Sequence, residues 1–587
     1  MRPTSPRSGS ALPLHSAWLA ALLVPLLAAP PARAQEARPY RPSVDVLDYE
    51  IVLDLPDTGR AIEGRAVLTV RRTLPRDTLV LDLVGLRVDS VLVNEKPAAF
   101  ARDAQTIRVA LPAGAPDSLR VTVRYGGEVT DGLIIRTDSI GRWMGFGDNW
   151  PNRARYWIPS VDHPSDKATV TWIVRAPSDR RVVANGALLE EAPLNYTVPV
   201  GVGTVGSASG VNAGNGRAWL ASAMPPGFVG RPRMITRWRE ARPIAPYLMV
   251  IAAAPLVYYD LGASACGHAE FPGCVRQSVY VAPEARDFLP GPFVRAGEIV
   301  DFFASLVAPF PYEKLAHVQS QTRFGGMENA SAIFYADAPF RQRTMGVGVI
   351  AHETAHQWFG DAVTEREWGH LWLSEGFASY FEQLWVEHSM GASAFRDGMT
   401  ELRTEVVRDT AVTRHRPVLD TAETSYLKLL NVNSYQKGAW VLHMLRSLVG
   451  DSAFFGGIRA YYTAHQHSTA LTDDLRRAME QASGQQLGWF FDQWLRRPGY
   501  PELRTGWRFD ARAHRVVLQV EQGKRWAPFR FPLTVDVEAA DGTTRRVTVD
   551  VPAARSAQLP LSLELTAAPT RVVFDPDVRL LATFAPR

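Results

Sequence analysis

Two histidines four residues apart, with a glutamate beside the first, constrain this chain more than any other feature. The segment reads His352-Glu353-Thr354-Ala355-His356, and Glu375 follows with eighteen residues between it and His356. Residues four apart lie on one face of a helix, so both imidazoles can face one metal ion. Two histidines and one glutamate form an open tetrahedral zinc site that keeps its fourth position for water. We therefore expect one Zn²⁺ per chain, bound by His352, His356 and Glu375.

Glu353 lies beside the first of these histidines and can reach a water on the metal. Zinc lowers the pKa of such a water to about 7, and a nearby carboxylate can take its proton. This arrangement predicts metal-assisted hydrolysis with Glu353 as the general base. The alternative is a helix with two surface histidines, which the apolar residues around the motif disfavour: Val349, Ile350, Trp358 and Phe359.

The chain is long enough for several domains, and its periodicity changes twice. From Val46 to about Tyr259 apolar and polar residues alternate, as in Leu47, Tyr49, Ile51 and Leu53, which is typical of half-buried strands. From about 280 to 497 the apolar residues recur with a helical period. After Pro498 the alternation returns, and Asp541-Gly542 between two such runs indicates a hairpin. We predict a multidomain α+β protein with a β domain, a helical catalytic domain and a small C-terminal β-sandwich.

The N-terminus has the features of a secretory signal peptide. Arg2 and Arg7 are its positive residues, Ala17 to Ala29 is its apolar core, and Ala32-Arg33-Ala34 is its cleavage site. The apolar run is too short to cross a bilayer. We predict an exported protein, periplasmic or secreted, with no integral membrane segment after cleavage. The expected parts are a signal peptide (1–34), a flexible lead-in (35–44), the N-terminal β domain (45–260), the zinc catalytic domain (261–500) and the C-terminal β-sandwich (501–587).

Charge and cysteine content narrow the partners. The formal net charge is only +4, and no dense basic run indicates nucleic-acid or membrane-surface binding. The chain has two cysteines, Cys266 and Cys274. In an exported protein a local disulfide between them is favoured. Joint zinc binding with His268 is the alternative, and the cysteine spacing is not that of a zinc knuckle.

Four ordered motifs resemble the M1, or gluzincin, zinc aminopeptidases. That family has the H-E-x-x-H-x18-E zinc site, a W-L-N-E-G-F-A-like segment around the third ligand, an upstream G-x-M-E-N and a later Y-x-K-G-A. The corresponding residues here are His352–Glu375, Trp372–Ala378, Gly325–Asn329 and Tyr435–Ala439. The resemblance spans roughly residues 45–500. It implies a saddle-like N-terminal domain and a thermolysin-like catalytic domain.

The resemblance also implies roles for residues outside the zinc site. Glu328 would bind the free α-amino group of a peptide, and Tyr435 would stabilise the tetrahedral oxyanion. Tyr426 competes for the second role but lacks the K-G-A context. The remaining residues of the substrate-binding segment are Gly325, Gly326, Met327 and Asn329. A turn glutamate paired with an arginine such as Arg323 is the alternative for Glu328.

Two further residues could orient the zinc ligands, and one position differs from the family pattern. Glu382 lies two helical turns after Glu375 and could orient a zinc-bound imidazole, although an exposed helix glutamate is the alternative. His370 is another candidate for such support. Many relatives carry a second amine anchor at the position of Trp150, for which Asp148 or Asn149 could substitute.

The expected function is hydrolysis of the N-terminal residue from peptides with a free α-amino group. The chain looks like a compact bacterial type without the long helical C-terminal domain, so we expect a more open cleft that admits longer peptides. Two alternatives stay open: an epoxide hydrolase of the leukotriene A4 hydrolase type, and a non-catalytic zinc-dependent peptide-binding protein. A thermolysin-like endopeptidase is a third, which Glu328 disfavours.

Overall fold

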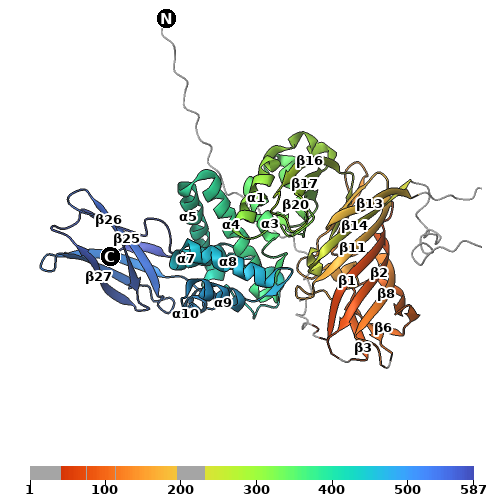
Figure 1. The fold of residues 1–587 in the computed structure, drawn as a ribbon, viewed down its shortest axis with the longest axis horizontal. Helices are drawn as coiled ribbons and strands as arrows, with labels where there is room; N and C mark the ends of the chain where they lie inside the picture. Colours follow the sequence, from red (N-terminus) through yellow and green to blue (C-terminus); the bar gives the residue numbers. More distant parts are fainter. Residues whose placement is uncertain (1–40, 42, 75, 113, 195–231) are drawn as a thin grey trace, which may run out of the picture.

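Three parts follow one another along the longest axis of the molecule (Figure 1). The computed structural model describes residues 41, 43–74, 76–112, 114–194 and 232–587. The predicted signal peptide lies outside these residues. The N-terminal strands and the C-terminal strands lie at opposite ends, and the helices lie between them. The mixed α+β architecture predicted from the periodicity is confirmed at this level.

The N-terminal part is built from three β-sheets. The largest has the order β13-β14-β11-β1-β2-β8-β4-β5, with β1 (Val44–Asp54), β2 (Ala61–Arg72), β4 (Arg87–Val93), β5 (Lys96–Pro97), β8 (Ser118–Glu128), β11 (Ala168–Pro177), β13 (Ala187–Leu194) and β14 (Arg233–Ile244). The second has the order β12-β15-β10-β9, with β9 (Leu133–Thr137), β10 (Trp143–Gly147), β12 (Arg181–Ala184) and β15 (Ile251–Ala254). The third has the order β3-β7-β6, with β3 (Thr78–Asp82), β6 (Phe100–Arg102) and β7 (Thr106–Ala110).

Strand β1 shows how alternation becomes a buried face, and where the simple pattern fails. Tyr49, Ile51 and Leu53 point into the core as predicted. Leu47, expected on the same face, is 39% exposed. The pairing of β1 with β2 shifts register between Val46 and Asp48, which marks an irregularity at Leu47. Because one extra residue reverses the alternation, Val46 is buried in place of Leu47.

The catalytic part combines a five-stranded sheet with the helices. The sheet has the order β16-β17-β18-β20-β19, with β16 (Val257–Ser264), β17 (Val275–Val281), β18 (Lys314–Ser320), β19 (Gly326–Met327) and β20 (Ala332–Ala336). The α-helices are α1 (Ala296–Leu306), α2 (Asp337–Gln342), α3 (Val347–His356), α4 (Trp372–Met390), α5 (Ala392–Arg408), α6 (Thr410–Thr413), α7 (Gly438–Val449), α8 (Asp451–His465), α9 (Thr472–Ser483) and α10 (Gly488–Leu495). A π-helical turn, η9 (Asn433–Lys437), leads directly into α7.

Several short elements complete this region and the loops before it. The 3-10 turns are η2 (Ala154–Tyr156), η4 (Pro246–Leu248), η5 (Pro283–Phe288), η6 (Gly291–Arg295), η7 (Trp368–His370) and η8 (Tyr426–Leu429). Strands β21 (Val363–Glu365) and β22 (Ser468–Ala470) pair in parallel. The predicted boundary at residue 260 falls inside β16, which pairs with β17 of the catalytic sheet. Strand pairing therefore puts the whole of β16 in the catalytic part.

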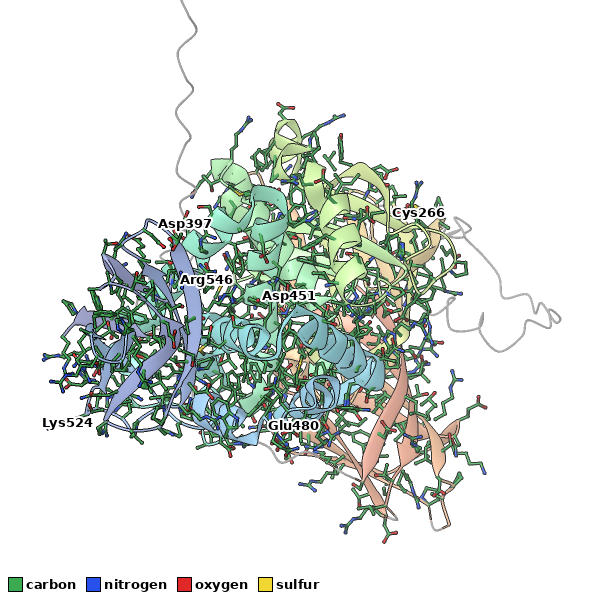
Figure 2. The ribbon with its side chains drawn as sticks, turned by 60° about the vertical axis from the view of Figure 1, so that its left-hand side comes forward. Cys266, Asp397, Asp451, Glu480, Lys524 and Arg546 are labelled. Carbon is green, nitrogen blue, oxygen red and sulfur yellow. A yellow bond between two sulfur atoms is a disulfide. The ribbon has the colours of Figure 1, made fainter. Side chains whose placement is uncertain are left out.

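The C-terminal part contains two sheets. One has the order β27-β24-β23-β29, with β23 (Glu502–Asp510), β24 (Arg515–Gln522), β27 (Ser556–Glu564) and β29 (Thr583–Pro586). The other has the order β26-β25-β28, with β25 (Phe531–Glu538), β26 (Thr544–Val551) and β28 (Arg571–Phe574). Strands β25 and β26 form the hairpin that Asp541-Gly542 predicted. Figure 2 shows these sheets with their side chains, with Arg546 of β26 labelled.

Specific contacts hold the three parts together. Lys167 of the N-terminal part donates from Nζ to the carbonyl oxygens of Asp361 and Ala362, both at 2.8 Å, just after the helix that carries the zinc motif. At the other end, His443 of α7 contacts the carbonyl oxygen of Val578 through Nε2 at 2.9 Å. The catalytic part is thus anchored on both sides.

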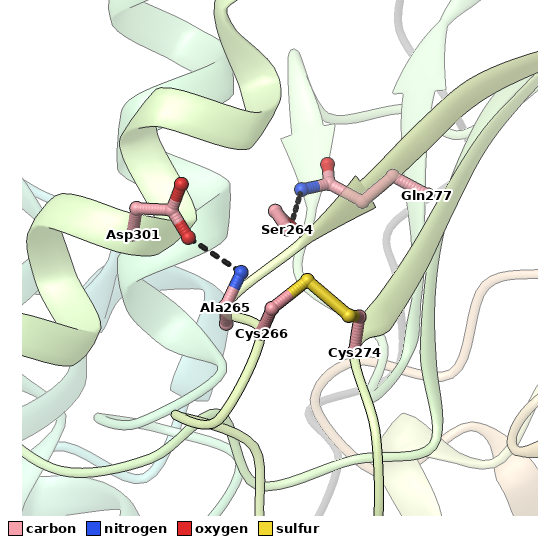
Figure 3. The surroundings of a disulfide bond; sticks show 6 residues. All are labelled: Ser264, Ala265, Cys266, Cys274, Gln277 and Asp301. Carbon is pink, nitrogen blue, oxygen red and sulfur yellow. Dashed lines mark hydrogen bonds between the residues drawn. A yellow bond between two sulfur atoms is a disulfide. The ribbon is translucent and has the colours of Figure 1, made fainter.

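Cys266 and Cys274 are joined in a disulfide at the edge of the catalytic sheet (Figure 3). The bond closes the loop between β16 and β17. Ala265, next to Cys266, donates its backbone N–H to the Asp301 carboxylate on α1 at 2.5 Å. The disulfide therefore ties a surface loop to the sheet, and it lies in a different region from the zinc motif.

Candidate active site

The three predicted zinc ligands meet where α3 and α4 lie side by side. His352 and His356 are one turn apart on α3, and Glu375 lies in the first turn of α4. Glu375 Oε2 is 3.4 Å from His352 Nε2 and 3.3 Å from His356 Nε2. All three donor atoms lie within 4.8 Å of one another. The helical spacing supplies the two histidines, and the contact between the helices supplies the glutamate.

These donor atoms fit a zinc ion. Two ligands about 2.1 Å from one tetrahedral ion are about 3.4 Å apart, which matches both nitrogen–oxygen distances. Two neutral imidazoles and one carboxylate are also the donor set of a catalytic zinc site, with one coordination position left open. Burial alone would raise the pKa of Glu375, but the protonated imidazoles beside it outweigh burial and lower that pKa. Against burial, Glu375 in turn raises the pKa of both imidazoles, and a bound metal ion would take the place of their protons.

Both imidazoles are oriented through their Nδ1 atoms. His356 Nδ1 lies 3.0 Å from the carbonyl oxygen of Phe359 and 3.0 Å from Ser374 Oγ. His352 Nδ1 lies 3.6 Å from Glu382 Oε2. A proton on Nδ1 leaves Nε2 free to bind metal, so these contacts favour the metal-binding tautomer. The predicted position of Glu382 behind an imidazole thus has its geometric counterpart.

Ser374 is a supporting residue that sequence reasoning missed. It precedes Glu375 directly, at the position where the W-L-N-E-G-F-A pattern has asparagine. Its contact with His356 depends on how α4 lies against α3. The signal that could have found it is its place beside the third ligand.

Glu353 lies between the metal-binding helix and the edge strand β19. It is 5% exposed, and burial raises the pKa of its carboxyl group. Gly326 of β19 is so close that a Cβ atom there would lie 2.0 Å from Glu353 Oε1. Only glycine fits between the strand and this carboxylate.

Glu328 comes directly after β19 and faces the same site. Its carboxylate belongs to a second group of close donor atoms, together with Glu353 and His356. It is 6% exposed. Burial raises the pKa of its carboxyl group, the charges of Glu375 and Glu353 raise it further, and His356 has the opposite effect. Arg323, the arginine considered as its partner, instead contacts Asp131 at 3.2 Å and Asp148 at 3.3 Å. Among the described residues Glu328 therefore has no cation paired with it.

The remaining residues of the predicted substrate-binding segment, Gly325, Met327 and Asn329, differ in their exposure. Strand β19 is the last strand of its sheet, so one of its edges is not paired within the sheet. Gly325 is exposed with open space around it. Met327 is buried in the core. Asn329 is also fully buried, and neither polar atom of its side chain has a hydrogen-bond partner within the described structure.

Tyr435 approaches the zinc ligands from the π-helical turn η9. Its ring is nearly parallel to that of His352, with centroids 6.1 Å apart. Burial raises the pKa of its hydroxyl well above the ordinary value, and the neighbouring Glu375, with which it makes a hydrogen bond, adds to the effect. The hydroxyl is thus protonated and can act as a donor. π-Helical turns inside α-helices are often found at functional sites.

Two family models match this chain. The peptidase M1 N-terminal domain matches residues 46–198, and the peptidase family M1 domain matches residues 295–494, which contain the zinc motif. Together they span more than half of the chain, in the order that the strands and helices follow. The chain belongs to peptidase family M1.

Two named aminopeptidases are similar to this chain over most of its length. The aminopeptidase N of Lactococcus lactis subsp. lactis is 30% identical over 490 residues, covering 77% of this chain and 51% of the relative. The aminopeptidase N of Streptomyces lividans is 28% identical over 572 residues, covering 92% of this chain and 61% of the relative. The chain thus spans less than two thirds of the length of these relatives.

A solved structure shares the fold. The M1 zinc metallopeptidase from Deinococcus radiodurans superposes with a TM-score of 0.61 at 24% identity, covering 77% of this chain and 93% of that one. Zinc is the metal of the family, and the donor set described above fits it.

Trp150, at the position expected for a second amine anchor, packs edge-to-face against Phe324 and Trp368, with centroids 5.9 and 5.3 Å apart. Asp148 is engaged by Arg153 and Arg323. The side chain of Asn149 donates to two backbone carbonyls and accepts from Trp157. Asp148 and Asn149, considered as substitutes for that anchor, are thus each already bonded to other partners.

His370, a second candidate for orienting a zinc ligand, serves a different purpose in this M1 chain. Its Nδ1 accepts the backbone N–H of Thr472 at 3.0 Å and contacts the hydroxyl of Thr472 at 2.9 Å. Burial lowers the pKa of His370 to about 4, so the ring is neutral. His370 therefore connects η7 to the first turn of α9.

Proposed function

We propose that this protein is a zinc aminopeptidase that removes single residues from peptides with a free α-amino group. The observation that carries the proposal is Glu328, a buried carboxylate without a paired cation among the described residues, at the end of an edge strand. Its donor atom lies within 4.8 Å of those of Glu353 and His356. A substrate ammonium is the cation that completes such a site, and blocked N-termini lack it. The M1 relatives named as aminopeptidases support the same activity.

The chain's own residues would divide the chemistry among them. When bound to His352, His356 and Glu375, zinc polarises the scissile carbonyl and lowers the pKa of a water to about 7. Glu353 accepts the proton of the attacking water and delivers it to the leaving amine. Tyr435 donates its hydroxyl hydrogen to the oxyanion of the tetrahedral intermediate, which contributes a few kcal/mol in the transition state, about 3 in comparable sites.

The free edge of β19 would hold the peptide in an extended form. Main-chain hydrogen bonds to an edge strand bind a peptide irrespective of its sequence. Gly326 allows this strand to approach Glu353 closely, and so brings the scissile bond next to the general base. The position of the amine at Glu328 then limits cleavage to the first peptide bond.

The test compares aminoacyl-anilides with their N-acetylated counterparts, using protein that starts at Gln35 and a Glu353→Gln control. We expect cleavage of the free-amine substrates only, with loss of activity in the control and with a chelator. Equal cleavage of acetylated substrates would mean that Glu328 does not select the amine. No cleavage by the zinc-loaded protein would favour the peptide-binding or the epoxide hydrolase alternative, and a lipid-epoxide assay separates these two.

We also propose that the protein is exported. The signal-like N-terminus supports this, and so does the disulfide, because disulfides persist in oxidising compartments. No helix within the described ranges is long and apolar enough to cross a membrane. N-terminal sequencing of the protein recovered from the periplasm or medium tests the proposal, with Gln35 as the expected first residue. An intact Met1 on cytoplasmic protein would contradict it.

The finer domain description belongs to the same proposal. It comprises a saddle-like N-terminal domain, a thermolysin-like catalytic domain and a C-terminal β-sandwich. The sheet orders given above support it. Limited proteolysis followed by mass spectrometry tests the domain boundaries, with cleavage expected outside the paired strands.

A further inference from the structure

A cavity of about 520 Å³ lies between the N-terminal and catalytic parts, beside the start of β19. One wall is the edge strand β9, from Leu133 to Arg136. The other wall is the segment Gln321–Arg323, which leads into β19, together with the beginning of α2. None of the zinc ligands lines this cavity. It is within the size range of ligand pockets, roughly 300–1,000 Å³.

The cavity is lined by more positive than negative charge. Its charged residues are four arginines and two aspartates: Arg60, Arg136, Arg323, Arg341, Asp131 and Asp337. Both aspartates are already engaged, Asp131 by Arg153 and Arg323 and Asp337 by Arg341. The cavity therefore presents a net positive wall.

Two of the arginines lack a carboxylate partner in the described part of the chain. Arg60 donates from Nε to the carbonyl oxygen of Val129 at 3.1 Å. Arg136 donates from Nη1 to Gln321 Oε1 at 3.5 Å, across the boundary between the two parts. Both side chains are exposed to solvent. Their guanidinium groups can therefore receive an anion, which they bind in a bidentate manner.

The course of a bound peptide leads into this cavity. Under the proposed function, the amine lies at Glu328 and the scissile bond lies beside Gly326 and Glu353. A peptide extended along β19 then continues past Gly325 toward Arg323. The segment before β19 is not a strand: residues 323–325 form a bend between the cavity wall at Gln321–Arg323 and Gly326. Residues of an extended peptide advance by about 3.3 Å each, so the third and fourth residues pass this bend and come within reach of the mouth of the cavity.

We propose that this cavity binds a carboxylate on the third or fourth residue of the peptide substrate. The carboxylate is either the C-terminal group of a tripeptide or tetrapeptide or an acidic side chain at those positions. Arg136 and Arg60 are its main partners. This inference rests on the proposed aminopeptidase function and specifies its substrate class: short peptides with a free C-terminus, or peptides that are acidic near their third residue.

The first experiment compares tripeptide and tetrapeptide acids with the same peptides as C-terminal amides. For the wild type we expect the acids to have a kcat/KM higher by roughly tenfold, mainly through KM, as for charge-assisted hydrogen bonds that are partly solvated. In an Arg60→Gln, Arg136→Gln double variant this ratio falls toward one. Because the ratio is taken within each variant, a general loss of folding or zinc cancels. Arg504→Gln, at an exposed arginine of β23, is the matched control and keeps the wild-type ratio.

The second experiment separates the two sources of the carboxylate. Amidated tetrapeptides with glutamate or glutamine at the third position report on side-chain recognition alone. A glutamate preference that the double variant loses identifies the acidic side chain, and a preference seen only for free C-termini identifies the terminal carboxylate. Either preference should weaken as salt is raised, because the arginines are exposed.

The failures of the two proposals are distinguishable. Hydrolysis of aminoacyl-anilides with equal rates for acids and amides, and for glutamate and glutamine, overturns the carboxylate site and leaves the aminopeptidase function intact. A preference that persists unchanged in the double variant also overturns it. No hydrolysis of any free-amine substrate overturns the proposed function, and the inference with it.

Discussion

Gly376 of α4 and Gly438 of α7 lie back to back where the two helices cross. A Cβ atom on either glycine would lie 2.9 Å from the Cα atom of the other. Gly376 directly follows the zinc ligand Glu375, and Gly438 comes three residues after Tyr435. The close approach of the two helices therefore brings the Tyr435 hydroxyl next to Glu375. This contact gives a physical reason for a glycine in both motifs.

Alanine at either position of this crossing is predicted to reduce kcat. The added methyl group has no room, so the helices must separate and carry Tyr435 away from the zinc ligands. A misplacement of about 1 Å can cost on the order of 10²-fold in rate. The measurement is kcat on an aminoacyl-anilide together with zinc content for Gly376→Ala and Gly438→Ala. Gly456→Ala is the matched control, because this helical glycine has nothing within 4 Å of the new Cβ. Wild-type kcat in both crossing variants would contradict the prediction.

Tyr435→Phe is predicted to lower kcat by roughly 10²- to 10³-fold with little change in KM, as for loss of one oxyanion donor. The hydroxyl makes its contribution mainly in the transition state, since the oxyanion forms only there. Steady-state kinetics on one anilide substrate checks the split. Tyr426→Phe is the comparison, because Tyr426 lies outside the K-G-A context and packs on Trp368 instead. A larger loss for Tyr426→Phe than for Tyr435→Phe would reverse the assignment.

Glu382→Gln is predicted to weaken zinc binding by roughly 10- to 100-fold. Glu382 lies 3.6 Å from His352 Nδ1, and its charge holds the imidazole in the metal-binding tautomer. Competition with a chromogenic chelator gives the zinc Kd without reference to activity. Glu298→Gln, at an exposed carboxylate paired with Arg295, is the control. An unchanged Kd in Glu382→Gln would make Glu382 an ordinary surface residue.

Stability is predicted to fall as the pH is lowered, in part through His443. Burial lowers the pKa of His443 to about 4. The hydrogen bond to Val578 raises this pKa, and the charges of Arg446 and Arg579 lower it. An unfolded histidine titrates near 6.5, so between these values only the unfolded chain takes up the proton. The stabilisation is complete above pH 6.5 and is lost as the pH falls toward 4. At pH 5 the loss amounts to about 2 kcal/mol.

His443→Gln isolates this contribution. The glutamine amide can keep the bond to the Val578 carbonyl oxygen and does not titrate. The free energy of unfolding of wild type and variant is measured by denaturant titration at pH 7.5 and at pH 5. Relative to the wild type, the variant should be more stable by about 2 kcal/mol at pH 5 than at pH 7.5. His415→Gln, at an exposed histidine, is the control. An equal difference at both pH values would show that His443 does not titrate on unfolding in this range.

Long-range contacts explain what the periodicity could not predict about the fold. The strands of β1, β2 and β3 and the helices around the zinc motif follow from apolar spacing. The irregularity at Leu47 depends on how β2 pairs with β1, and the position of β16 depends on its pairing with β17. The paired residues, such as Asp48 with Thr69 and Tyr259 with Val279, are about twenty positions apart, so a periodicity along one strand does not predict their pairing.

The chain's sequence by itself predicted the zinc site, because the spacing of His352 and His356 acts within one helical turn. It also identified Glu375, Glu328 and Tyr435 as candidates through their motifs. Only the tertiary structure decided which partners these residues have. The fold places Ser374 against His356. It pairs Arg323 with Asp131 and Asp148, so Glu328 has no cation partner among the described residues. It also brings Arg60 and Arg136 to one cavity. The physical reason is range: helical geometry relates residues a few positions apart, whereas charges and close helix contacts relate segments that meet only when the chain is folded.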